Sequence, residues 1–309
     1  MKIYNHINEF TPLKNAIVTI GTFDGVHQGH RQIIAGIKEL ARQTGGETVI
    51  LTFFPHPRMI IHPEDQTLKL ITTIHERAAL LEQLGVDHLI ITPFSRDFSN
   101  QLPEAYIRDI LVNKIGTRKI IIGYDHRFGK DRQGGLTDLQ QAGPIYGFEV
   151  IEIPEQDIDH VAVSSTRIRE ALLKADIEQA NNFLSYPFFI TGKVIRGNQI
   201  GRQIGYPTAN LLVEENYKII PADGIFASTV EIAGQTYQGM SYIGHRPTIN
   251  GMTRNIEVNI FDFNQDIYNQ TVKMNFNHFV RHDVKFSSLE GLKEQLAQDQ
   301  LDVLALLNG

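Results

Sequence analysis

Two histidines three residues apart stand in a glycine-rich segment near the N-terminus. His27 and His30 belong to residues 21–30, whose glycines permit a tight turn and let a phosphate approach the backbone. Histidines at the start of a helix can donate hydrogen bonds to the charge that develops on a transferring phosphorus atom. The segment therefore predicts attack on an α-phosphate with loss of pyrophosphate. Two ordinary loop histidines are the alternative interpretation.

Three further segments contain groups that could contact a nucleotide or a planar ring. Residues 52–57 offer aromatic surface on which a ring could stack. Residues 123–129 supply a carboxylate and a cation. Residues 163–169 open a helix, where hydroxyls and backbone amides suit the β- and γ-phosphates and Arg169, rather than Arg167, is expected to turn inward. Simple N-capping is the alternative for the hydroxyls.

A second candidate phosphate site lies in the C-terminal half of the sequence. Glycines at 197, 201 and 205 predict a flexible loop whose amides could wrap a phosphate chain. Thr208 and Asn210, two residues apart on an expected strand, point to one face and together can hold Mg²⁺. Glu257, on a strand of alternating character, could accept the proton of an attacking alcohol. A solvent-facing glutamate is the alternative there.

The elements around the first site alternate between strands and helices up to about residue 180. Such alternation predicts a doubly wound parallel sheet, which binds ligands beyond the carboxyl ends of its strands. The expected strands are 16–20, 47–53, 88–91, 119–122 and 149–153, and the expected helices are 31–44, 74–84 and 103–112.

The pattern changes after residue 187, where short strands are separated by Gly, Pro and Asn-rich turns. The expected strands are 188–195, 225–232, 236–243, 256–263 and 271–279. Ser287 and Glu290 are spaced as a capping box before a helical apolar stripe. We therefore expect an antiparallel β-barrel of the six-stranded type with a C-terminal helix. The expected domains are residues 1–184 and 185–309.

Composition narrows the classes of function. The chain has 309 residues, no cysteine and a formal charge of −6. Disulfides, thiolate metal sites and cysteine nucleophiles are therefore excluded, and a nucleic-acid-coating surface is disfavoured. The sequence has neither an apolar core of signal-peptide length at its start nor an apolar run of 18 residues. We expect a cytoplasmic protein.

The segments of the first half resemble, in order, the FMN adenylyltransferase domain of prokaryotic bifunctional riboflavin kinase/FMN adenylyltransferases, which has a nucleotidyltransferase fold. The resemblance implies that His27 and His30 are catalytic and steady the ATP phosphates while the FMN phosphate attacks. It implies flavin contacts for Phe54, His56, Asp125 and Phe128. Its implied ATP-binding residues are Gly21, Thr22, Phe23, Asp24, Gly29, His30, Asp125, Arg127, Ser164, Ser165, Thr166 and Arg169. His126 departs from the family's usual aromatic residue or Asn.

The second half resembles the riboflavin kinase domain of the same enzymes over most of residues 187–309. The resemblance implies that Glu257 is the general base and that Thr208 and Asn210 bind Mg²⁺. The implied ATP-binding residues are Gly192, Lys193, Gly197, Gly201, Gly205, Pro207, Thr208 and Asn210, and the implied flavin-binding residues are Gly224, Ile225, Phe226 and Arg281. Tyr206 replaces the commoner Phe, and Asn259 stands where His is frequent.

The resemblance implies phosphorylation of riboflavin to FMN by the C-terminal domain and adenylylation of FMN to FAD by the N-terminal domain. ATP and Mg²⁺ are the expected cofactors. The expected partners are riboflavin, FMN and ATP, with neither nucleic acid nor membrane and at most weak homo-oligomerisation. Three alternatives are a kinase whose N-terminal half only binds nucleotide, a flavin-binding regulator that contacts nucleic acid, and an adenylyltransferase with another acceptor, pantetheine or nicotinamide mononucleotide phosphate.

Overall fold

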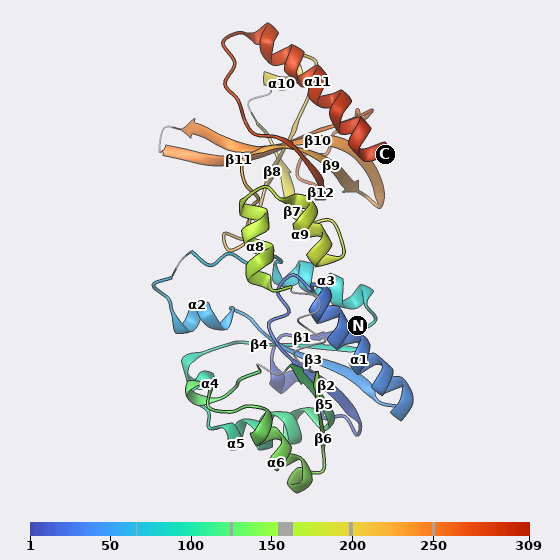
Figure 1. Cartoon of the computed structure of the whole chain (residues 1–309), viewed down its shortest axis with the longest axis vertical. Helices are drawn as coiled ribbons and strands as arrows, with labels where there is room; N and C mark the ends of the chain where they lie inside the picture. Colours follow the sequence, from blue (N-terminus) through green and yellow to red (C-terminus); the bar gives the residue numbers. More distant parts are fainter. Residues whose placement is uncertain (66, 124–125, 154–162, 198–199, 249–250) are drawn as a thin grey trace. The chain divides into compact units, whose positions relative to one another are not determined.

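The structure is a computed structural model of the whole chain. It describes all residues except 66, 124–125, 154–162, 198–199 and 249–250. For residues 200, 203, 246–248 and 251–253 only the backbone is described. The contacts divide the chain into two compact units, residues 1–165 and 166–309, and each is described by itself (Figure 1).

A six-stranded sheet forms the centre of the first unit, with strand order β1-β4-β3-β2-β5-β6. Every neighbouring pair is parallel. Strand β2 is buried along its whole length, which explains its unbroken apolar and β-branched sequence. The strands are β1 (Lys2–Tyr4), β2 (Ala16–Ile20), β3 (Glu47–Phe53), β4 (His88–Thr92), β5 (Thr117–Gly123) and β6 (Glu149–Ile153).

Helices cover both faces of this sheet. Helix α1 (Gln28–Thr44) packs against β2, β3 and β5 and buries Ile34 and Ile37. The π-helix η2 (Tyr106–Ile115), which continues α5 (Pro103–Ala105), shares a core cluster with α6 (Leu136–Tyr146) and with alternate residues of β2 and β3. The shorter helices are η1 (Ile7–Glu9), α2 (Pro57–Ile61), α3 (Ile74–Gln83), α4 (Arg96–Ser99) and η3 (Lys130–Arg132).

The parallel doubly wound sheet expected from the sequence is confirmed, and its expected strands all occur. The sequence did not predict β1 or α6. Strand β1 has only three residues, too few to show a period. Helix α6 contains Pro144, a residue that normally interrupts helices.

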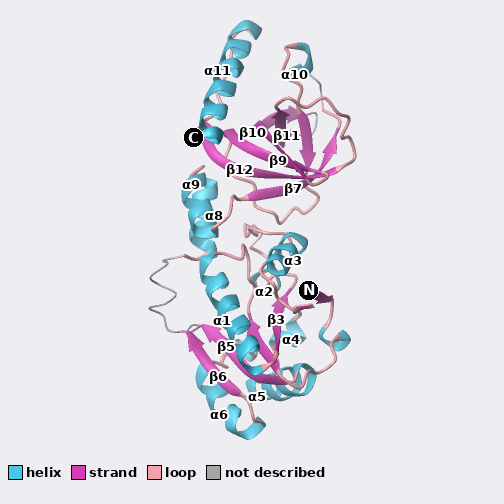
Figure 2. Ribbon diagram, turned by 90° about the vertical axis from the view of Figure 1, so that its right-hand side faces the viewer, coloured by secondary structure: helices cyan, strands magenta, loops and turns pink. Residues whose placement is uncertain are grey.

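A closed antiparallel barrel forms the second unit, with strand order β10-β11-β8-β7-β12-β9 (Figure 2). The expected barrel of six strands is therefore confirmed. Closure satisfies the hydrogen-bonding groups that an edge strand would leave exposed. The strands are β7 (Phe189–Ile195), β8 (Ala209–Leu212), β9 (Gly224–Ile232), β10 (Gln235–Thr248), β11 (Gly251–Ile260) and β12 (Thr271–Arg281).

Helices α8 (Ser165–Leu173), α9 (Ile177–Leu184) and α11 (Leu289–Asn308) flank the barrel strands in sequence. Helix α9 contacts β12, and α11 contacts β9, β10 and β12. The expected capping box at Ser287 and Glu290 is wrong, because the helix is capped one residue later and its N3 residue, Gly291, has no side chain to complete a box. Ser288 is the N-cap residue, because its extended backbone lets its hydroxyl accept a hydrogen bond of 3.1 Å from the N–H of Gly291.

Candidate active sites

The segment between β2 and α1 forms a tight turn at the carboxyl edge of the parallel sheet, reached through Gly21 and Thr22. Phe23, Gly25 and Val26 adopt positive φ angles of 50°, 84° and 40°. At Gly25 a side chain would be strained, and its Cβ would lie 3.0 Å from Ile71. The turn leads to the N-terminus of α1, where the first backbone N–H groups can bind an anion.

His27 is the N-cap residue of α1, and His30 lies in the first turn. Their imidazole rings stack with centroids 3.7 Å apart and planes inclined by 20°. Gly29 between them is buried, and a Cβ there would lie 3.4 Å from the His27 ring. The structure therefore brings both predicted histidines together at a helix N-terminus.

The surroundings of His30 favour a neutral ring. Its Nδ1 atom is buried and has no hydrogen-bond partner among the residues that the structure describes. Burial lowers the pKa of His30 well below its ordinary value of 6.5, and electrostatic interactions with His27 and Arg77 lower it further. A neutral imidazole has one N–H donor and one acceptor, so it can donate to a phosphate oxygen at pH 7.

Asp24 stands in the same turn, but its carboxylate is fully buried. It accepts hydrogen bonds of 3.1 Å from the backbone N–H groups of Ile71 and Thr72. The guanidinium of Arg77 lies 3.5 Å from Oδ1 of Asp24. The side chain therefore holds the turn against residues 71–77, and its contact with ATP stays a prediction.

Aromatic side chains follow the carboxyl ends of β3 and β5. Phe54 is half-buried, and His56 is the N-cap residue of α2. Phe128 is 8% exposed and lies with its ring centroid 5.1 Å from Tyr106 and 5.8 Å from His126. Phe54 therefore offers some accessible aromatic surface after β3, whereas the Phe128 ring is buried, and the flavin contacts of both residues stay predictions.

Sequence reasoning missed Tyr106, which is 2% exposed. The hydroxyls of Tyr106 and Thr92 and the side-chain carbonyl oxygen of Gln101 are buried without a hydrogen-bond partner in the described part of the chain. Burial raises the pKa of the Tyr106 phenol, which therefore keeps its O–H donor. The helical period marks Tyr106 only as a core residue, so no sequence signal distinguishes it.

The remaining predicted residues of this site are less closely grouped. The hydroxyl of Ser165 donates a hydrogen bond of 3.0 Å to the carbonyl oxygen of Asp24, whereas Ser164 and Arg127 are exposed. Asp125 lies outside the described residues. Thr166 and Arg169 belong to the second unit. Their contacts with ATP stay predictions.

The second site lies on barrel strands β8 and β11. Asn210 stands directly opposite Glu257 in this antiparallel pair, so their side chains share one face. The Thr208 hydroxyl donates a hydrogen bond of 2.9 Å to Oε2 of Glu257, and the Asn255 amide donates to Oε1. Asn210 and Glu257 are 8% and 7% exposed. The structure thus brings the predicted hydroxyl, amide and carboxylate together.

The glycines before β8 let the backbone of residues 197–205 pack closely against Asn210 and Tyr206. A Cβ at Gly197 would collide with the Asn210 side chain, and one at Gly201 would collide with the Tyr206 carbonyl oxygen. Gly205 has a φ of 90°. The predicted flexible loop is wrong in one respect, because residues 200–203 form the short helix α10 (Ile200–Gln203).

Asn259 and Pro207 connect this turn to β11. The Asn259 amide donates a hydrogen bond of 2.7 Å to the Pro207 carbonyl oxygen, and Asn259 is 7% exposed. The departure from the family's His therefore supplies a contact that holds the turn before Thr208. Gly192 packs closely against β8, with its Cβ position 3.0 Å from the Leu212 carbonyl oxygen, and Lys193 is exposed.

Arg281 and the start of β9 form the predicted flavin side of the barrel. Gly224 and Arg281 approach closely, whereas Ile225 and Phe226 are 5% and 0% exposed. Nε and Nη2 of Arg281 donate hydrogen bonds of 2.7 Å to the two oxygens of Asp299, which is fully buried in α11. Arg281 is therefore anchored to the C-terminal helix, and its flavin contact stays a prediction.

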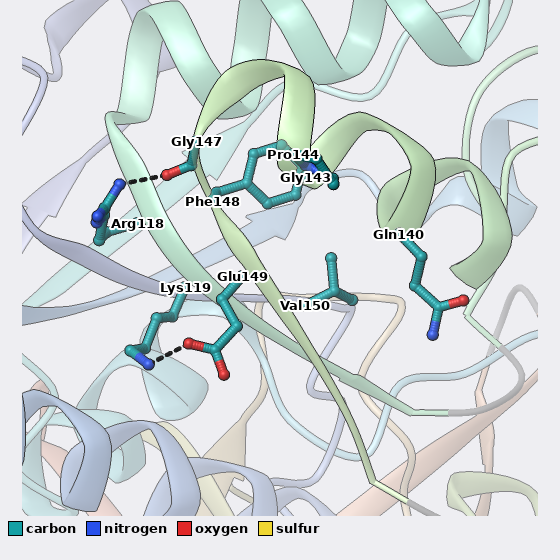
Figure 3. A pocket seen from close by; sticks show the side chains of 9 residues that line it. All are labelled: Arg118, Lys119, Gln140, Gly143, Pro144, Gly147, Phe148, Glu149 and Val150. Atoms are coloured by element: carbon teal, nitrogen blue, oxygen red, sulfur yellow. Dashed lines mark hydrogen bonds and ion pairs between the residues drawn. The ribbon is translucent and has the colours of Figure 1, made fainter.

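A cavity of about 560 Å³ lies elsewhere in the first unit (Figure 3). Its lining includes Arg118, Lys119 and Glu149, at the amino ends of β5 and β6, whereas the histidines follow the carboxyl end of β2. Arg118 donates to the Gly147 carbonyl oxygen and Lys119 pairs with Glu149. The cavity therefore does not belong to the predicted phosphate site.

A turn that leads into a helix N-terminus on a parallel sheet, and a hydroxyl–amide–carboxylate group in a closed barrel, indicate an enzyme of phosphate-group transfer. Comparison with known families makes the class specific. Residues 10–167 match the family model described as FAD synthetase, and residues 184–307 match riboflavin kinase. The chain belongs to the bifunctional riboflavin kinase/FMN adenylyltransferase family, with its FAD synthetase part N-terminal and its kinase part C-terminal.

Relatives with that name match along nearly the whole chain. The protein of Listeria monocytogenes is 36% identical, covering 96% of this chain and 94% of the relative. That of Escherichia coli K12 is 33% identical, covering 97% and 96%. A crystal structure of a macrolide-efflux protein from Streptococcus pneumoniae is also similar, with a TM-score of 0.86, 32% identity and 97% coverage of each chain.

One finding bears on two of the three alternatives. The FAD synthetase match over residues 10–167 contradicts the alternatives of a nucleotide-binding half without transferase activity and of an acceptor other than FMN. Separately, none of the helices among the described residues is both long enough and apolar enough to span a bilayer.

Proposed function

We propose that the two reactions run at separate sites, one in each unit. In the barrel, Glu257 accepts the proton of the riboflavin 5′-hydroxyl, whose oxygen attacks the γ-phosphate of ATP to give FMN and ADP. The observation that carries this assignment is the pair of hydrogen bonds from Thr208 and Asn255 to the two oxygens of Glu257. A carboxylate fixed in this way is positioned to act as a general base.

Mg²⁺ is the metal that the chemistry of these side chains fits. Thr208 and Asn210 offer a hydroxyl and an amide oxygen beside the Glu257 carboxylate, and Mg²⁺ prefers oxygen ligands that it shares with phosphates. Thr208 and Asn210 would hold the ion. When bound, Mg²⁺ neutralises charge on the phosphate oxygens. The close approach of Gly197 to Asn210 supports a phosphate chain held by residues 192–208 at the same place.

In the first unit, an oxygen of the FMN phosphate attacks the α-phosphorus of a second ATP, and the bond to pyrophosphate breaks to give FAD. The stacked rings of His27 and His30 at the N-terminus of α1 carry this assignment. A neutral His30 with a buried nitrogen can donate to the α-phosphate as charge develops. Phe54, His56 and Phe128 would bind the flavin ring, and Ser164 and Ser165 would bind the leaving pyrophosphate.

Both reactions consume ATP and act on soluble flavins, which supports the cytoplasm as the place of action. The partners would be riboflavin, FMN and ATP. Self-association, where it occurs, would be weak.

Purified protein incubated with riboflavin, ATP and Mg²⁺ should form FMN and then FAD. Chromatography of samples taken over time measures both products. Glu257→Ala should abolish FMN formation and retain conversion of supplied FMN to FAD, and His30→Ala should do the reverse. Loss of both activities in either folded variant would contradict separate sites. Addition of EDTA should stop FMN formation, and excess Mg²⁺ should restore it.

A further inference from the structure

Arg77, on helix α3, is a cation buried beside the phosphate turn, and none of the sequence motifs contains it. Its side chain and that of Asp24 are each 1% exposed. Charges without water are tolerated in a protein interior when they are paired and hydrogen-bonded. The guanidinium lies 3.5 Å from the Asp24 carboxylate and donates to the Thr72 hydroxyl and carbonyl oxygens at 3.5 and 3.4 Å.

The groups that Arg77 contacts hold the turn directly. The Thr72 hydroxyl accepts a hydrogen bond of 3.1 Å from the N–H of Gly25, and Asp24 accepts another of 3.1 Å from the N–H of Ile71. Gly25 has a positive φ, and a Cβ there would lie only 3.0 Å from the Ile71 side chain. Residues 24 and 25 are therefore fixed just before the chain reaches the stacked histidines.

We propose that Arg77 is a positioning residue for adenylyl transfer. Through Asp24 and Thr72 it fixes the turn that presents His27 and His30, and its positive charge acts on the His30 ring. The inference rests on the proposed role of the two histidines. Arg77 itself touches neither reacting phosphate nor flavin in this assignment.

The charge of Arg77 provides a signature that a purely structural residue lacks. Burial, His27 and Arg77, in this order, lower the pKa of His30. Among the described residues, the titratable groups that act on His30 include His27 and Arg77, and Asp24 is the carboxylate paired with Arg77. An uncharged side chain at position 77 should therefore raise the pKa of His30, whereas lysine should leave it low.

The test uses full-length Arg77→Gln and Arg77→Lys, with Arg42→Gln as the matched control. Arg42 also lies in the first unit and pairs with Glu39, but its side chain is 72% exposed. NMR titration of the His30 imidazole and the kcat and KM for FAD formation from FMN are measured for each variant. Riboflavin phosphorylation in the same samples checks the second unit.

We expect Arg77→Gln to raise the His30 titration midpoint and to reduce kcat for FAD formation by about ten- to a hundredfold, as a small misplacement of catalytic groups does. Arg77→Lys should keep the low midpoint and recover part of kcat. Arg42→Gln should match the wild type in both. If folded Arg77→Gln loses only thermal stability, with midpoint and kcat unchanged, the proposal is overturned.

A second variant covers the case in which Arg77→Gln does not fold because the Asp24 charge is left unpaired. Asp24→Asn/Arg77→Gln removes both charges, and the same two readouts apply to it. The titration midpoint of His30 is measured by NMR and can be obtained even for a variant without enzymatic activity. A wild type that makes no FAD, or a fully active His30→Ala, would instead contradict the proposed function.

Discussion

The hydroxyl of Thr208 donates a hydrogen bond of 2.9 Å to Oε2 of Glu257, so the proposed metal ligand and the proposed base are in direct contact. A hydroxyl has one donor and two lone pairs. Thr208 can therefore donate to the carboxylate while its oxygen faces a cation. In the proposed kinase site, this geometry would couple the position of the base to the position of the ATP phosphates.

Thr208→Val should reduce the rate of riboflavin phosphorylation by about ten- to a hundredfold, since a hydrogen bond to a charged group contributes about 1.5–3 kcal/mol. It should also raise the Mg²⁺ concentration required for half-maximal rate. Thr208→Ser keeps the hydroxyl and should retain most activity. FAD formation from supplied FMN should not change, and a Val variant as active as the wild type would refute the role of the hydroxyl.

Asn181, on helix α9, forms hydrogen bonds with the barrel and therefore bears on where the barrel unit begins. Its amide donates to the carbonyl oxygens of Phe276 and Asn277 at 2.9 and 3.3 Å, and its oxygen accepts from the N–H of Phe188 at 2.7 Å. Asn181→Ala should lower the free energy of unfolding of the barrel by about 1–3 kcal/mol, because buried backbone groups lose partners. Asn182→Ala, at the exposed neighbouring position, is the control.

The contacts of Asn181 also allow a test between two alternative domain boundaries. The expected boundary assigns residues up to 184 to the N-terminal domain, whereas the contacts assign 166–309 to one unit. A fragment of residues 166–309 should therefore unfold at higher urea concentration than one of residues 185–309. Equal midpoints would favour the boundary at 184/185.

The pairing of Arg281 with Asp299 should stabilise the barrel against its C-terminal helix. Breaking a buried ion pair costs about 3–5 kcal/mol, and partial exposure of Arg281 should reduce this to about 2–3 kcal/mol for Asp299→Asn. The exposed Asp302, which accepts from Gln298 at 2.8 Å, provides the control Asp302→Asn. Denaturant unfolding measures both, and equal stabilities would show that the pair contributes nothing.

The low pKa of His30 makes the first unit sensitive to acid. Below pH 6.5, the unfolded chain binds a proton at this position that the folded protein does not bind. Stability should therefore fall as pH decreases from 6.5 towards the folded pKa, by at most about 1.4 kcal/mol per pH unit. Subtracting the profile of His30→Gln isolates this contribution. A difference that is flat between pH 7.5 and 5 would contradict it.

Much of the fold could be predicted because its signals are local. Strands such as Ala16–Ile20 are apolar runs ending at glycine, and strand–helix alternation implies a parallel sheet. Helix α6 could not be predicted, since Pro144 opposes a helix locally and packing overrides that preference. The N-cap of α11 shifted by one residue because adjacent serines offer the same hydroxyl.

For the sites, the sequence alone identified the residues whose chemistry is carried by their type and spacing: His27 and His30 after a glycine turn, and Thr208 and Asn210 two apart. Arg77 was not among them. Its role depends on a buried contact with Asp24 across 53 positions of sequence, which no local pattern records.

The sequence by itself therefore determined most of the strands and helices, the two candidate phosphate-binding segments and the family. Tertiary structure decided which groups meet: Asn255 with Glu257, Arg77 with Asp24, and Arg281 with Asp299. The physical reason is the distance in sequence over which each interaction acts. Backbone conformation and side-chain periodicity are set by near neighbours, whereas the pairing of a buried charge depends on how distant elements pack.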